Sequence, residues 1–438
     1  MPDCELHSVY HWAGQVVPEQ SSPFISYACG WSNFVGNAAG DASFASAFAS
    51  ILNATIIISG HSGLALSLRV LISILITLLW SLLNILRIDR IGSVLFFAAF
   101  LQVSTLVLIV GIVLANVTKL NPTSYVFSSY HNETGFDNKA YVIIISLLSS
   151  LYGFSGYEAS AHMAEETSGA SRNAPRGMIL TVLASGIVGL GYLLVLLYST
   201  TDIDGAINGG STNAAIQVFD NLLGRPWTIV ISCLLLTNVF FAGLSSVAVT
   251  ARITFALVRD NAFPFSSYFA VIYPIFQTPL RAILAVSILN AGMLLLPLNA
   301  DGQTAFVSIT GVSTVGFQIS YMIPILCKAI FQSIPLPYTD MSLGSWSFPC
   351  GAVSSLWLLT SSLIFFLPTS SPVTSKNMNY TGVVVVCFIC VAMINWFLYS
   401  KYIFKGPRRA EYIGKCRLNV DTMNGFSTRY STFKYAPI

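Results

Sequence analysis

Long apolar stretches alternate with short polar connections along most of this 438-residue chain. A helix needs roughly 20 apolar residues to cross the hydrocarbon core of a bilayer, where it satisfies its own backbone hydrogen bonds. The pattern therefore predicts an all-α integral membrane protein. Ten stretches are long enough, or nearly so, to span: 24–58, 66–86, 91–117, 141–163, 178–198, 229–257, 280–298, 306–331, 353–367 and 382–403.

The apolar stretches divide the chain into three regions. Residues 1–23 form a polar segment before the first span, 24–403 form the membrane domain, and 404–438 form a polar tail. The first stretch is longer than one upright helix needs, so we expect it to tilt. The stretch 353–367 is short for a span.

Basic residues predict the orientation of the spans. The tail from Lys401 onward holds eight of the 21 Lys and Arg residues, and positive segments favour the cytoplasmic side. With an even number of spans, eight of the remaining thirteen also fall inside and five outside. The Asn-X-Thr triplets at Asn116, Asn132 and Asn379 fall outside or at the outer end of a span, whereas that at Asn53 lies within a span. We expect a multi-pass protein of the plasma membrane or an endomembrane, with a cytoplasmic C-terminus.

Composition supports lipid as the main solvent of the chain. Hydrophobic residues make up 54% and charged residues 9%, with a mean hydropathy of +0.71, whereas soluble proteins carry roughly 25% charged residues. The net charge of +3 leaves no polybasic surface for nucleic acid. Cys387 and Cys390 in "VVVVCFIC" have the spacing of a metal or redox pair, but two small buried side chains on one helix face are favoured. No cofactor is expected.

One stretch, "GFSGYEASAHMAEET", concentrates charge at the end of an apolar span. Gly153 and Gly156 lie three residues apart there, and each glycine costs a helix about 1 kcal/mol relative to alanine. We therefore expect the helix to unwind at this point. Backbone groups freed at membrane depth are tolerated only where they line a cavity or meet a ligand.

Four ionisable residues follow this expected break. If the second half-helix starts near Gly156, then Glu158, His162 and Glu165 share one face, and Glu166 lies further round. Glu158 is either a carboxylate held by the helix amino terminus or a group for cation binding or proton coupling. His162 is either a satisfied interior histidine or a proton carrier. For Glu165 and Glu166, solvated ion pairs with the basic loop are favoured over a role in coupling or gating.

A carboxylate in the first span, Asp41, is costly in lipid and is expected to face the interior. Its neighbours Gly36 and Gly40 form a row of small residues that is typical of tight helix packing. Coupling or gating and buried structural pairing remain equal alternatives for Asp41.

The residues around the expected break also carry a family resemblance. The stretch "GFSGYEASAHMAEETSGASRNAPRGM" resembles the signature of the amino acid–polyamine–organocation superfamily, in its branch of eukaryotic amino acid, γ-aminobutyrate and choline permeases. The stretches "VYHWAGQVVPE", "WSLLNILRIDRIG", "ARITFALVRDNAFP" and "TPLRAIL" extend the resemblance over about residues 10–405. The family fold contains two inverted five-helix repeats, and the resemblance maps the ten spans onto family helices three to twelve.

The resemblance implies a secondary transporter, not an enzyme, that moves an amino acid, γ-aminobutyrate or a choline-like amine by alternating access. Carried over residue by residue, Gly153, Phe154, Ser155, Gly156 and Tyr157 form an unwound segment that holds the substrate. Glu158 matches an acidic position just after it. The third span has no lysine where some family members carry one in place of a cation, so a co-transported proton and a sodium ion both remain open.

Two rival functions stay open at this point. An intramembrane enzyme using "HMAEE" as a metal or acid–base site needs two or three more converging ligands. A non-transporting membrane subunit or splice form is the other rival, because the family map leaves the first two family helices without a counterpart.

Overall fold

The computed structural model describes residues 9–86, 88–162, 170–201, 205, 213–273, 278–298, 302–332, 343–375 and 377–406. Among these residues, nine helices are long and apolar enough to cross a membrane. They match nine of the ten expected spans, and the all-α membrane architecture is confirmed. The nine are α2 (Ser22–Ile58), α3 (Leu66–Ile85), α4 (Ile88–Asn116), α8 (Ala170–Ser199), α11 (Arg225–Arg259), α13 (Leu280–Leu294), α14 (Gly302–Ile330), α15 (Ser347–Ile364) and α16 (Thr381–Asn395).

The one remaining expected span, 141–163, is the fourth along the chain. It contains two helices, α6 (Lys139–Gly153) and α7 (Ala159–His162). Shorter elements occupy the connections and ends: α1 (Val9–Gln15), α5 (Thr123–Ser128), α10 (Ala214–Leu223), α12 (Ser266–Phe269) and α17 (Lys401–Ile403). Two more continue longer helices, a 3₁₀ turn after α13 (Leu296–Leu298) and a π-helix after α16 (Trp396–Ser400). Another 3₁₀ turn, Gly344–Trp346, precedes α15.

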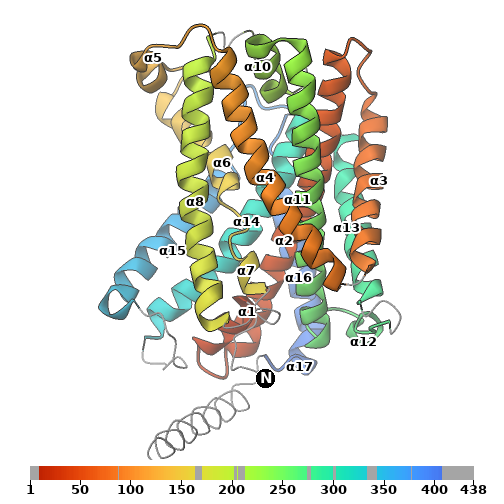
Figure 1. Cartoon of the computed structure of the whole chain (residues 1–438). Coiled ribbons are helices and arrows are strands. Elements are labelled where there is room, and N and C mark those ends of the chain that lie inside the picture. The colour runs from red at the N-terminus through yellow and green to blue at the C-terminus, as the bar shows by residue number, and fades with distance from the viewer. Residues whose placement is uncertain are drawn as a thin grey trace, which may run out of the picture.

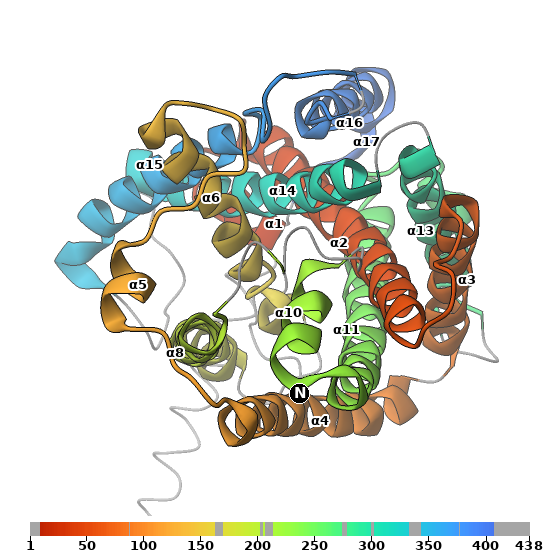
Figure 2. The same ribbon diagram turned by 90° about the horizontal axis from the view of Figure 1, so that it is seen from above.

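The helices stand roughly side by side around a pair that crosses in the middle, α2 and α14 (Figures 1 and 2). α2 packs most extensively against α14 and α11, and α3 and α13 lie beside it at one edge. Seen from above, α15 and α16 lie on one side of this centre and α4 and α8 on the other (Figure 2). The break between α6 and α7 lies next to α14.

Glycines let the two central helices approach closely. A Cβ on Gly316 of α14 would lie 2.6 Å from the amide nitrogen of Gly36 in α2, so the two backbones touch at this point. Ser313 of α14 donates a 2.8 Å hydrogen bond to the carbonyl of Gly36. The predicted small-residue packing of α2 is therefore confirmed. α14 is one continuous helix through Gly316 and Pro324.

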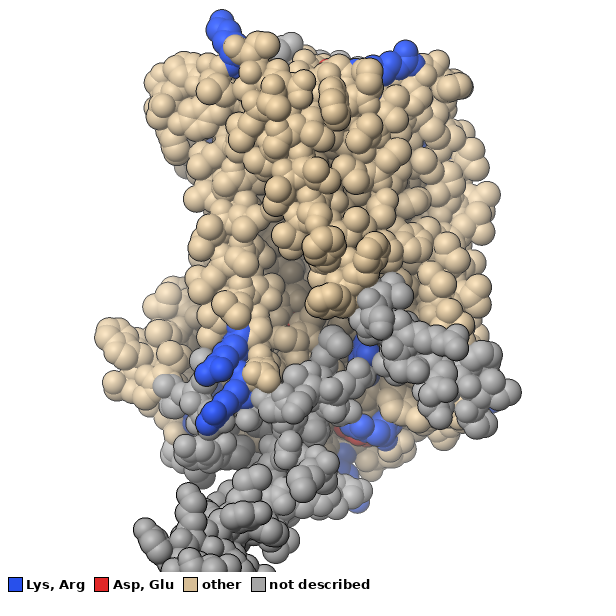
Figure 3. Space-filling model, in the orientation of Figure 1, with Lys and Arg blue, Asp and Glu red and all other residues tan. Residues whose placement is uncertain are grey.

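The outer surface of the bundle is apolar. Large side chains on the outer helices are exposed, for example Leu82 on α3, Phe96 on α4 and Ile187 on α8. Figure 3 shows a broad band without Lys, Arg, Asp or Glu on one face, with Lys and Arg gathered at its two ends. Because no water is available inside a bilayer to favour charge, this band is the surface that lipid tails cover.

The prediction for one pair of residues is wrong. Cys387 and Cys390 were expected to be buried within the protein, but both are exposed on α16. The spacing places them on one face of the helix as expected. That face points outward, because α16 lies at the edge of the bundle (Figure 2).

Candidate functional site

The helix of the fourth apolar stretch stops at Gly153 and resumes at Ala159, as predicted from its paired glycines. Gly156 has a φ of 84°, a left-handed conformation that a helix cannot contain. The second half-helix therefore starts later than the expected position near Gly156. Glu158 lies in the turn just before it, where its carbonyl accepts the first amide hydrogen bonds of α7, from Ala161 and His162.

Several backbone groups in this break have no partner in the described part of the chain. The carbonyls of Gly153, Phe154 and Ser155 accept no hydrogen bond from a described residue, and the amide of Tyr157 donates none to one. Gly153 and Phe154 are exposed, and Ser155 and Tyr157 are half-buried. Transporters leave backbone groups free in this way where a broken helix lines a site. The break therefore presents carbonyl acceptors and an amide donor next to each other.

The carboxylate of Glu158 is almost completely buried beside the break, with 1% of the residue exposed. One oxygen, Oε1, accepts a 3.3 Å hydrogen bond from Asn33 Nδ2 on α2. The other, Oε2, accepts a hydrogen bond from the hydroxyl of Tyr321 on α14. None of the ion pairs found among the described residues involves Glu158. A buried carboxyl with only neutral donors is stable when it holds a proton or meets a cation.

Tyr321 connects the carboxyl to the unwound backbone. Its hydroxyl also accepts a 3.3 Å hydrogen bond from the amide of Gly156, and its ring lies 4.7 Å from that of Tyr157. Phe154 turns the other way, with its ring next to Gly186 of α8. Tyr157, and not Phe154, is therefore the aromatic side chain of the break that lies near the carboxyl.

The other predicted ionisable residues of this stretch have different outcomes. His162 is buried one turn after Glu158, and its Nε2 has no hydrogen-bond partner among the described residues. Glu165 and Glu166 lie outside the described residues. The part of the predicted face that the structure describes, Glu158 and His162, is buried in the protein.

Asp41 does not join this site. It lies on α2 eight residues after Asn33, which is about 12 Å along a helix at 1.5 Å per residue. Asp41 accepts hydrogen bonds from Ser246 of α11 and Asn290 of α13. α2 thus contributes to two separate buried carboxyl sites, through Asn33 at the break next to α14 and through Asp41 beside α11 and α13.

Sequence reasoning missed two residues of the site, Asn33 and Tyr321. Asn33 is polar within a span, in "WSNFVGN", and that is a usable signal because polar groups are rare at membrane depth. Tyr321 in "ISYMIP" carries no such signal, since tyrosine is common in apolar helices. Ser320 completes the group by accepting a 3.2 Å hydrogen bond from Asn33.

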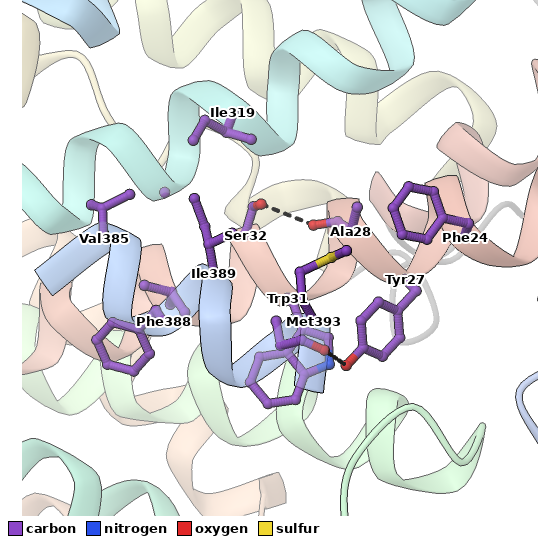
Figure 4. A pocket seen from close by; sticks show the side chains of 13 residues that line it. Phe24, Tyr27, Ala28, Trp31, Ser32, Ile319, Val385, Phe388, Ile389 and Met393 are labelled. Atoms are coloured by element: carbon purple, nitrogen blue, oxygen red, sulfur yellow. Dashed lines mark hydrogen bonds between the residues drawn. The ribbon is translucent and has the colours of Figure 1, made fainter. Parts of the chain in front are cut away.

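A cavity of about 100 Å³ lies elsewhere, between α2, α14 and α16 (Figure 4). Its walls are mostly aromatic and aliphatic, including Tyr27, Trp31 and Phe388. The hydroxyls at its edge are already paired within the protein, Tyr27 with the carbonyl of Ala392 at 2.7 Å and Ser32 with that of Ala28 at 2.8 Å. This cavity offers no free polar group to a charged molecule, in contrast to the break.

Metal-ligating side chains do not gather in the described part of the chain. No group of three or more His, Cys, Asp or Glu residues placed to hold a metal ion occurs among the described residues. The break therefore offers backbone groups, one buried carboxyl, one buried imidazole and a tyrosine pair. This set suits reversible binding of a small polar molecule.

Comparisons with known proteins agree on one family. A family model described as amino acid permease matches residues 7–389. The chain is 32% identical to the amino-acid permease BAT1 of Arabidopsis thaliana, over 91% of this chain and 80% of that protein. It is 29% identical to a BAT1 homolog of Oryza sativa subsp. japonica, over 91% and 79%. It is 27% identical to a choline transporter of Saccharomyces cerevisiae, over 67% of this chain and 52% of the transporter.

Proposed function

Because this chain belongs to the amino acid permease family, we propose that it moves an amino acid or a related small amine across a membrane by alternating access around the break between α6 and α7. One observation supports the proposal most directly. At the break, backbone groups without a hydrogen-bond partner among the described residues lie beside the buried carboxyl of Glu158. A permease must hold a polar substrate at membrane depth, and such groups replace the water that the substrate loses.

The break suggests how a zwitterion would bind. The ammonium group would donate hydrogen bonds to the carbonyls of Gly153, Phe154 and Ser155. The ring of Tyr157 would add cation–π attraction. A substrate carboxylate, where there is one, takes the amide of Tyr157. The same carbonyls and ring would also suit γ-aminobutyrate or a choline-like amine, and the choline transporter among the relatives supports that wider range.

Glu158 is our first candidate for the coupled proton and His162 the second. Glu158 shares Tyr321 with the amide of Gly156, so a change of charge on the carboxyl alters the hydrogen bond that holds the unwound backbone. This link supports coupling between proton binding and the shape of the substrate site. A sodium ion bound by the same carboxyl is the alternative coupling ion.

The test is uptake into vesicles reconstituted with the full chain. We expect wild-type protein to accumulate at least one amino acid, γ-aminobutyrate or choline when a proton gradient is imposed. In Glu158→Gln, uptake driven by the gradient should fall to the level of empty vesicles. Glutamine can accept from Asn33 and donate to the hydroxyl oxygen of Tyr321, but it cannot take up a proton.

The matched control is Glu133→Gln, since Glu133 is an exposed carboxylate in the connection between α5 and α6. It should transport like the wild type. Undiminished pH-dependent uptake by Glu158→Gln would remove Glu158 from the coupling role. Absence of flux for every substrate in wild-type vesicles, with protein correctly inserted, would favour the non-transporting subunit instead.

The orientation is part of the same proposal. The basic tail after Lys401 supports a cytoplasmic C-terminus in the plasma membrane or an endomembrane. α1 and α17 lie at one end of the bundle and α5 and α10 at the other (Figure 1). On this reading, the end with α1, α12 and α17 faces the cytoplasm.

A further inference from the structure

A second buried carboxyl lies where three helices meet. Asp41 of α2 is completely buried, with 0% of the residue exposed. Its Oδ1 accepts a 2.5 Å hydrogen bond from the hydroxyl of Ser246 on α11, and its Oδ2 accepts a 3.3 Å hydrogen bond from Nδ2 of Asn290 on α13. α2, α11 and α13 are neighbours in the bundle (Figure 2). The carboxyl thus links all three helices.

Among the described residues, no ion pair compensates the charge of Asp41. Tyr152 of α6 is bonded to Ser43, two residues along α2 from Asp41, and Arg252 of α11 is six residues beyond Ser246. Among the described residues, the hydrogen bonds and ion pairs of Arg69 of α3, Arg281 of α13 and Tyr321 of α14 do not involve Asp41. An ionised carboxylate without a cation is very costly in such a place.

Asn290 has one polar atom left over. It is completely buried, and its Oδ1 has no hydrogen-bond partner among the described residues. This oxygen belongs to the amide group that already contacts the Asp41 carboxyl. A protonated carboxyl has an O–H to donate, and a half-turn of the amide brings Oδ1 to face it. One proton on Asp41 therefore removes both the uncompensated charge and the orphaned acceptor.

The described surroundings of Asp41 favour a proton over a multivalent metal ion. Its partners are a hydroxyl and an amide, and no group of three or more His, Cys, Asp or Glu residues placed to hold a metal ion occurs among the described residues.

We propose that Asp41 binds a proton, with Asn290 and Ser246 as its hydrogen-bond partners. This proton site is separate from the carboxyl at the break. When protonated, it joins α2 to α11 and α13 through neutral hydrogen bonds. Loss of the proton leaves a buried charge, which water entry or separation of these helices must relieve. The site stands independently of the proposed transport, because its occupancy is measured without substrate or flux.

The test is infrared spectroscopy on the purified full chain at neutral pH. A neutral carboxylic acid has a carbonyl stretch well separated from the bands of ionised carboxylates. We expect the wild-type spectrum to contain such a band that Asp41→Asn removes and that Glu158→Gln leaves in place. Replacing sodium by potassium should not change it.

A second variant covers the case in which Asp41→Asn fails to fold. Asn290→Leu keeps the carboxyl and the side-chain size but removes the acceptor for its proton, so the Asp41 band should shift. Failure of Asp41→Asn to remove any neutral-acid band would overturn the proposal. An unshifted band in Asn290→Leu would also overturn the proposal. A band that disappears when sodium is added would overturn it as well, because it would indicate a cation site.

Discussion

Gly156 adopts a backbone conformation that only glycine takes easily, and this turns the chain between α6 and α7. Its φ is 84°, whereas nothing lies within 4 Å of the place a Cβ would occupy. The backbone conformation, and not lack of space, is therefore what requires glycine. Gly153 also has open space around its Cβ position, but it ends α6 in an ordinary helical conformation. The two glycines thus differ in backbone conformation, and neither lacks space for a side chain.

This difference gives a prediction at the residue scale. Gly156→Ala should destabilise the break by about 1–2 kcal/mol, the cost of a left-handed conformation for a residue with a Cβ. Gly153→Ala should be neutral or stabilise α6 by up to about 1 kcal/mol, because alanine favours a helix over glycine. The measurement is the thermal stability of each purified variant in detergent, together with its uptake rate.

The pair serves as its own control, since neither alanine meets a neighbouring atom. Equal losses in the two variants would mean that Gly156 does not hold the left-handed turn. A greater loss in Gly153→Ala would point to a break centred one turn earlier.

Some residues of the site were predictable from the sequence, and others were not. Gly153, Gly156 and Glu158 stand out locally, because paired glycines and charge are unusual inside an apolar stretch. Asn33 and Tyr321 are 125 and 163 residues from Glu158 along the chain. No local sequence pattern predicts that those side chains contact Glu158, because the contacts depend on how α2 and α14 cross.

At the scale of elements, α2 organises the interior. It crosses α14 at Gly36, holds Asn33 next to the break and holds Asp41 against α11 and α13. Asn33 and Asp41, through which α2 contributes to the two carboxyl sites, lie about 12 Å apart along this helix. A tilt of α2 relative to α14 would therefore alter both sites together.

The close crossing of α2 and α14 predicts that a side chain at Gly316 is destabilising. A Cβ on Gly316 would lie 2.6 Å from the backbone nitrogen of Gly36 and 2.9 Å from the carbonyl oxygen of Ser32. Backbone atoms cannot rotate away, so Gly316→Ala must push the helices apart. We expect a loss of about 1–3 kcal/mol, typical of overpacking, measured as thermal stability in detergent.

Gly292→Ala is the matched control, because Gly292 lies within α13 and nothing is within 4 Å of its Cβ position. It should be neutral or slightly stabilising. If Gly316→Ala is as stable as Gly292→Ala, the two backbones do not touch as the structure indicates.

Helix positions were largely predictable, and their interruptions less so. Apolar length sets where a chain can cross lipid, so α3 covers Leu66–Ile85 where 66–86 was expected. The restart after the break was placed near Gly156 but begins at Ala159, because a residue with φ of 84° cannot enter a helix. The outward face of Cys387 and Cys390 followed from the place of α16 in the bundle, which its own sequence does not encode.

For the whole molecule, the sidedness of the bundle can be tested at the Asn-X-Thr triplets. Asn132 is exposed in the connection between α5 and α6, at the end opposite to α1. Asn53 and Asn379 are buried, with 1% and 9% exposed, and Asn116 is the last residue of α4. Only Asn132 lies in an exposed connection beyond the ends of the helices.

In a eukaryotic cell we therefore expect one N-linked glycan, attached to Asn132, because the proposed orientation puts this connection in the lumen or outside. Enzymatic deglycosylation should increase electrophoretic mobility once, and Asn132→Gln should abolish that shift. The control is Phe426→Thr, which creates a triplet at Asn424 in the tail and should receive no glycan. A glycan on the tail together with none on Asn132 would reverse the orientation.

The sequence by itself determined that this chain is an integral membrane protein. It also determined the positions of the helices, the point at which one of them breaks, and the family to which the chain is related. These properties follow from local chemistry, since apolar length, paired glycines and a family signature are all read within a short window. Only the tertiary structure decided that Glu158 meets Asn33 and Tyr321, that Asp41 sits apart with Ser246 and Asn290, and that Phe154 turns toward α8. The physical reason is that a buried carboxyl is satisfied by groups from other helices, and the packing of whole helices chooses which groups those are.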